Sequence, residues 1–128
     1  MITHETALDM VPGGNSGDTG SKVTLYLNQD DEDFILKFNL LARTGTLTIE
    51  NGTTASIQGT KNDNTTFEGS ATLDVESKTV TVQGSRDMTN VDGKGQFELC
   101  LTHSNKKLHS ANFTIQVEKK PVPKTSGA

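Results

Sequence analysis

Three histidines and one cysteine are the residues of this chain that could hold a soft metal ion. His103 and His109 bracket a polar segment, and Cys100 lies three residues before His103. Because His and Cys are the ligands that zinc prefers, a site could form if that segment closed as a symmetric turn. However, residues at odd separation in a strand point to opposite faces, so Cys100 and His103 should diverge. We expect His103 and His109 to be exposed turn residues, and His4 to lie in a polar N-terminal arm.

An acidic run, Asp-Asp-Glu-Asp at residues 30–33, could be a calcium site. An EF-hand loop needs oxygen ligands at alternating positions, a central glycine and a glutamate at its twelfth position. Here the fifth residue counted from Asp30 is Phe34. The run therefore predicts a solvated turn between two strands.

Other short motifs do not predict a modification site, a phosphate-binding loop or a catalytic site. Three N-x-Ser/Thr triplets, at Asn51, Asn64 and Asn112, lack a secretory signal, so we interpret them as chance matches. Gly-Lys-Gly at residues 93–95 has neither the spacing nor the Ser/Thr of a phosphate-binding loop. No Ser/His/Asp or Cys/His arrangement is favoured by the strand pattern. We expect no catalytic residue, no metal site and no cofactor, and therefore a protein that is not an enzyme.

Length and composition indicate one domain rich in strands. A chain of 128 residues can bury one core, and its 31% hydrophobic and 5% aromatic residues, with abundant Thr, Ser, Asn and Gly, favour strands and turns over helices. Twelve Lys and Arg against sixteen Asp and Glu, without a basic cluster, argue against nucleic-acid binding. The first ten residues contain no continuous apolar block, so we expect neither a signal peptide nor a membrane span, and a cytosol-like compartment or release by lysis.

The clearest strands are residues 95–102 and 111–117. Large apolar residues recur at every second position in both, which is typical of a strand with one dry face. The polar segment between them predicts an antiparallel hairpin that forms the floor of the core. Cys100 points away from this face and is interpreted as a small buried filler residue. The seven apolar side chains predicted to share one face are Phe97, Leu99, Leu101, Ala111, Phe113, Ile115 and Val117.

Further alternating runs complete an all-β pattern. They cover residues 23–27, 34–41, 53–60, 67–75 and 78–83. Residues 87–91, either a short helical turn or an irregular crossing, should plug one end of the sheet with Met88 and Val91. Short strands at such spacing predict an immunoglobulin-like two-sheet β-sandwich. We divide the chain into a flexible arm (residues 1–21), the sandwich (22–119) and an extended tail (120–128). The arm, rich in glycine at its end, could order on assembly by adding a strand to a neighbour.

Several phrases of the sequence resemble a known family in order and spacing. They lie at residues 25–34, 55–61, 87–94, 97–101 and 108–118, within a match that covers roughly residues 23–119. Together they resemble the N-terminal domain of the upper baseplate proteins of tailed phages of Gram-positive bacteria.

This resemblance implies a non-catalytic β-sandwich docking module of a bacteriophage virion, assembled in the host cytoplasm. Because ten residues follow Glu118 where the family continues into a stalk, we expect the module to act alone, on the tail baseplate or as a capsid decoration. Its partners would be other virion proteins, namely baseplate or tail proteins or the major capsid protein. We expect a homo-oligomer or symmetric array built through the N-terminal arm, with neither nucleic acid nor membrane.

An alternative function is a free carbohydrate- or host-protein-binding β-sandwich module. Such modules commonly stack sugars on exposed aromatic rings. Tyr26 is the only tyrosine, the chain has no Trp, and all five Phe residues fall in or beside predicted strands. The sequence therefore leaves this alternative with a single candidate ring.

Overall fold

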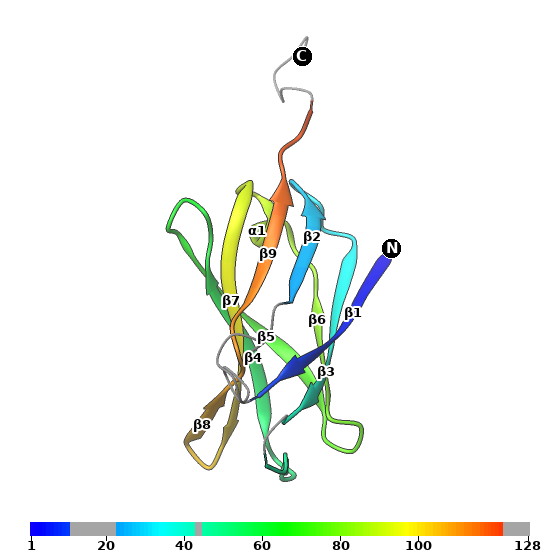
Figure 1. Ribbon diagram of the computed structural model, residues 1–128, viewed down its shortest axis with the longest axis vertical. Helices are drawn as coiled ribbons and strands as arrows, with labels where there is room; N and C mark the ends of the chain where they lie inside the picture. Colours follow the sequence, from blue (N-terminus) through cyan, green and yellow to red (C-terminus); the bar gives the residue numbers. More distant parts are fainter. Residues whose placement is uncertain (11–22, 43–44, 122–128) are drawn as a thin grey trace.

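The computed structural model describes residues 1–10, 23–42 and 45–121, and these ranges are nearly all β. The one helix among them, α1 (Arg86–Thr89), has four residues, so no described helix is long and apolar enough to cross a membrane. The predicted all-β class is confirmed (Figure 1). The strands are β1 (Ile2–Asp9), β2 (Thr24–Asn28), β3 (Phe34–Leu41), β4 (Thr54–Thr60), β5 (Thr66–Asp74), β6 (Thr79–Gln83), β7 (Gly93–His103), β8 (Lys106–His109) and β9 (Phe113–Glu118).

The strands hydrogen bond along one path, β1-β3-β6-β5-β4-β7-β9-β2, with β8 paired to the end of β7. This arrangement is a nearly closed sheet around one core. The strands at the two ends of the path, β1 and β2, run parallel to their neighbours, β3 and β9, and all other pairs are antiparallel. Although β2 and β3 are consecutive in the sequence, they lie near opposite ends of this strand order.

The antiparallel pairing predicted between residues 95–102 and 111–117 is confirmed for the first part of β7, where Gly93–Phe97 pair with Phe113–Val117 of β9, whereas Cys100–His103 pair with β8. Phe97 lies directly opposite Phe113, and both side chains are buried. All seven apolar side chains predicted to share this face are buried. The segment between the two strands is more ordered than a simple turn, because it contains β8. Ser104 and Asn105, both with positive φ, connect β7 to β8 in the two-residue turn that suits a tight hairpin.

Phenylalanine rings from different strands meet in the centre of the core. The ring centroids of Phe38 on β3 and Phe113 on β9 are 4.9 Å apart. The Phe97 ring lies 6.2 Å from Phe113 and 6.2 Å from Phe67 of β5. These four rings join both halves of the strand path, so the core is continuous across the molecule.

Helix α1 closes one end of the sheet, as the sequence predicts. Met88 is 1% exposed, and the Thr89 hydroxyl donates a hydrogen bond of 2.6 Å to the Asp31 carbonyl oxygen in the β2–β3 turn. Lys61, only 7% exposed, also contacts α1 and the residue that follows it. Its Nζ donates to the Asp87 carbonyl oxygen at 2.9 Å and to Asn90 Oδ1 at 3.0 Å. A buried ammonium requires such acceptors, so Lys61 ties the β4–β5 turn to the helix.

The N-terminal segment differs from the flexible arm predicted over residues 1–21. Residues Ile2–Asp9 form β1, which pairs with β3 along its whole length, and residues 11–21 lie outside the described ranges. Burial of Leu8 and Met10 anchors the strand, together with a hydrogen bond from the Met10 amide to the Leu41 carbonyl oxygen. The strand was missed because residues 2–7 are exposed or half-buried and carry no apolar alternation.

The start of the predicted C-terminal tail is held against the body. The Lys120 amide donates to Gln29 Oε1 at 3.1 Å, and Lys120 Nζ lies 2.9 Å from Asp30 Oδ2. Residues 122–128 of the tail lie outside the described ranges. The chain therefore leaves β9 along the β2–β3 turn.

Candidate functional site

The outer surface of β5, β4 and β7 is a polar face. Alternation places Ile57, Phe67 and Phe97 inside, so the residues between them point outward. The register aligns Glu68, Gln58 and Glu98 in one row across the three strands. We call this surface the polar face; its members are Ser56, Gln58, Thr60, Thr66, Glu68, Ser70, Gln96 and Glu98.

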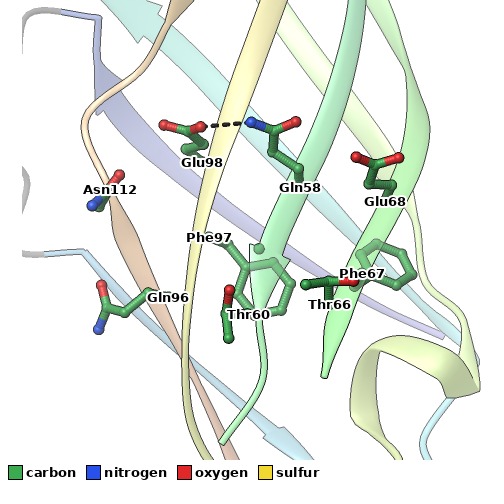
Figure 2. A pocket seen from close by; sticks show the side chains of 10 residues that line it. Gln58, Thr60, Thr66, Phe67, Glu68, Gln96, Phe97, Glu98 and Asn112 are labelled. Carbon is green, nitrogen blue, oxygen red and sulfur yellow. Dashed lines mark hydrogen bonds between the residues drawn. The ribbon is translucent and has the colours of Figure 1, made fainter. Parts of the chain in front are cut away.

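A shallow, open hollow of about 460 Å³ lies on the polar face (Figure 2). Gln58 Nε2 donates a hydrogen bond of 2.7 Å to Glu98 Oε2, and Glu68 lies on the other side of Gln58. Gly59, between Phe67 and Phe97 in register, is part of the floor. The hollow thus offers the carboxylates of Glu68 and Glu98 and the side-chain amides of Gln58, Gln96 and Asn112 for hydrogen bonding, and no Ser, Cys or His is found among the described residues that line it. Such a surface suits binding of a polar partner.

A second hollow of about 410 Å³ adjoins the first and reaches Cys100. Cys100 is a free thiol on the outer side of β7, 4% exposed, with its Sγ 3.9 Å from the Thr102 hydroxyl. Its register partners are Ser56 on β4 and His109 on β8. Cys100 therefore points away from the core face, as predicted, and its burial agrees with a filler residue.

The three histidines lie apart from one another. The symmetric closure that could bring His103 and His109 together does not occur, because His103 pairs with Lys106 and His109 pairs with Cys100. His103 Nε2 instead lies 3.7 Å from Glu50 Oε1. His4 is half-buried on β1, so it belongs to the sheet. Among the described residues, no three His, Cys, Asp or Glu side chains are grouped so that they could hold a metal ion.

The acidic run is a turn between β2 and β3, as predicted, and its carboxylates form ion pairs with three distant segments. Besides the Asp30–Lys120 contact, Glu32 Oε2 lies 3.3 Å from Arg86, and Asp33 Oδ2 lies 3.5 Å from the Met1 ammonium. The sequence reveals the turn but not these partners, which come from both ends of the chain and from α1.

The remaining short motifs lie in turns or at the starts of strands. Gly93 has φ +104°, and a Cβ there would lie 2.5 Å from the Asn62 side chain, so glycine is required where β7 begins. Asn51 and Asn64 lie in turns, and Asn112 directly precedes β9. All three asparagines are exposed.

Comparison with known proteins links this chain to a phage protein through its fold. No family model matches the chain, and no curated protein sequence does. Among solved structures, it is similar to the N-terminal domain of phage TP901-1 ORF48, with a TM-score of 0.68 at 15% sequence identity. The match covers 93% of this chain and 100% of that domain. The resemblance to a phage domain seen in the sequence is therefore supported at the level of the fold.

Proposed function

We propose that this protein is a non-catalytic structural component of a bacteriophage virion, a docking module attached to the tail baseplate or decorating the capsid. The observation that carries the proposal is the likeness in fold to the N-terminal domain of a phage protein over nearly the whole of both chains. The open polar hollow supports the docking role, because its carboxylate and amide groups could pair with a protein partner.

The polar face is the proposed contact with a neighbouring virion protein. It spans three strands and presents the Glu68 and Glu98 carboxylates beside the Gln58 amide. These groups can pair with Lys, Arg or amide side chains of a partner, and such charge pairs fix the register of an interface.

The proposed homo-oligomer uses residues 1–21. β1 is the end strand of the path and pairs with β3 on one side only. Its other edge could therefore pair with a strand of a neighbouring copy and extend the sheet across the two molecules. Many copies on a symmetric surface would multiply weak contacts into a stable array. Deleting residues 1–7 should leave the buried anchor, Leu8 to Met10, in place while removing most of that edge.

We also propose that the strand path forms the two stacked sheets of an immunoglobulin-like sandwich. β5 pairs with β4 through Thr66–Ala71 and with β6 through Thr72–Asp74, so a single strand would pass from one sheet into the other. The contact between the Phe38 and Phe113 rings agrees with two layers that face each other.

The test is to locate the protein on purified virions. An antibody to it, gold-labelled and imaged by electron microscopy, should mark either the tail tip or the capsid. Glu68→Lys should lower the number of copies per particle, whereas Glu76→Lys, the same charge change at the exposed β5–β6 turn, should not. Absence of the protein from purified particles would overturn the proposal.

A further inference from the structure

The sole tyrosine lies at a further hollow, on the outer side of β2 and β9, which lie side by side in Figure 1. Tyr26 is 69% exposed and is opposite Gln116 in register. The hollow has a volume of about 620 Å³ and is also lined by Asn28, Asp92 and Glu118. Tyr26 therefore presents an exposed aromatic face, surrounded by polar side chains, to a molecule that enters the hollow.

The polar side chains around Tyr26 are available to a ligand. Within the described part of the chain, the side chains of Asn28, Asp92 and Gln116 form no hydrogen bond with another residue. The two amides each offer donors and an acceptor, and the carboxylate accepts only. The three side chains therefore combine hydrogen-bond donors and acceptors. Neighbouring hydroxyl groups of a ligand, which both donate and accept, need such a combination.

We propose that this hollow binds a neutral hexopyranose, with the sugar ring stacked on Tyr26. The C–H face of a pyranose is apolar and slightly positive, which complements the negative face of an aromatic ring. Its equatorial hydroxyls can then reach Gln116 and Asn28. This inference does not depend on where the protein is attached to a virion. It goes beyond the proposed docking role, because it assigns a small-molecule ligand to a different surface of the protein.

The charges of the lining select against an anionic sugar. Asp92 and Glu118 contribute two carboxylates, and Lys119 contributes one ammonium. The described lining is therefore negative by one charge, and a phosphate or uronate group would be repelled. A protein partner is less favoured, because Leu27 and Val117 are buried and Tyr26 is the only exposed large apolar side chain among the described lining residues.

The composition of the chain provides a specific measurement. Since the chain has one Tyr and no Trp, its intrinsic fluorescence above phenylalanine emission reports on Tyr26 alone. The probes are methyl glucoside, methyl galactoside, methyl rhamnoside and N-acetylglucosamine, with glucose 1-phosphate and glucuronate as anionic controls. At least one neutral probe should change the emission saturably, with a Kd on the order of millimolar, as expected for an open site with one stacking ring. The matching anionic probe should bind at least tenfold more weakly.

Variants distinguish sugar binding at Tyr26 from binding elsewhere on the protein. Tyr26→Phe should retain binding in calorimetry or amide NMR, Tyr26→Ala should weaken it at least tenfold, and Gln116→Ala should weaken it severalfold. Leu108→Ala, which removes an exposed apolar side chain on β8, should bind as the native protein does.

Two results would overturn the proposal: saturable binding that survives in Tyr26→Ala, and failure of every neutral probe. Loss of virion incorporation in Tyr26→Ala without any sugar binding would identify a protein interface instead. Failure of the virion test leaves the sugar titration unaffected, so the two proposals can fail separately.

Discussion

Gly59 on β4 lies directly opposite Phe97 on β7, and a Cβ atom added to Gly59 would come within 2.4 Å of the Phe97 ring. The same added atom would lie 2.6 Å from the Gln96 carbonyl oxygen, so the backbone also limits the space. The missing side chain of Gly59 thus allows the Phe97 ring to cover the strand and contact Phe67. This glycine shapes the floor of the hollow on the polar face.

Gly59→Ala should destabilise the protein by about 1–3 kcal/mol, the usual cost of forcing an extra carbon into a packed site. Gly69→Ala on β5 is the matched control, because its added Cβ would meet the Phe67 ring at 3.1 Å and no backbone atom. We expect a clearly smaller change for the control. Urea unfolding at pH 7 measures both, and equal stabilities of the two variants would contradict the close approach.

Lys61→Met should lower the free energy of unfolding by about 1–3 kcal/mol. The change keeps most of the side-chain volume but leaves the Asp87 carbonyl oxygen and Asn90 Oδ1 without their donor. Lys106→Met, at an exposed position of β8, should change stability by less than about 0.5 kcal/mol. Thermal unfolding of both variants makes the comparison, and a stable Lys61→Met protein would show that the ammonium is dispensable.

Lys120→Gln should destabilise the protein by about 0.5–1 kcal/mol, because Asp30 is largely shielded from water and the pair is short. Arg86→Gln, which breaks the contact with Glu32 between two largely exposed side chains, is expected to have little effect. Raising the salt concentration to about 1 M should reduce part of the difference between Lys120→Gln and the native protein, since the Lys120 side chain is 42% exposed and ions can screen its charge. A difference that does not respond to salt would point to lost packing of the lysine chain.

Asp63 should contribute a pH-dependent part of the stability. Hydrogen bonds from the Thr65 hydroxyl and the Thr65 amide lower the pKa of the Asp63 carboxyl from its ordinary value of 3.8. A lowered pKa in the folded state means that the stabilisation is present above the ordinary pKa and is lost as the pH falls through the folded value. Asp63→Asn should therefore lose less stability than the native protein as the pH falls from about 5 to about 2, through the ordinary pKa of 3.8 and below it. Parallel urea titrations across this range measure the difference, and identical slopes would exclude the contribution.

The sequence predicted the elements better than their arrangement. Alternation located β3 at its observed bounds and identified the face shared by Phe97 and Phe113, because burying one face of a strand imposes period two. β8 was missed since all four of its residues are exposed. The parallel pairing of β2 with β9 joins residues about ninety positions apart, and alternation carries no information about such partners. The Lys61 contacts were likewise beyond prediction, since nothing local marks a lysine for burial.

The β7–β8 turn provides a last test of the fold. Ser104 and Asn105 have φ values of +51° and +65°, a left-handed conformation that costs most side chains energy and costs glycine none. Replacing the pair with Asn-Gly, through Ser104→Asn and Asn105→Gly, should raise the free energy of unfolding, because Asn and Gly adopt the left-handed conformation at lower cost than Ser and Asn do. The change touches no core residue, since both positions are exposed. Chemical unfolding should show the gain, and a loss of stability would mean that the segment is not a two-residue turn. In that case β8 would no longer place His109 opposite Cys100, and the thiol would lose the strand that lies beside it.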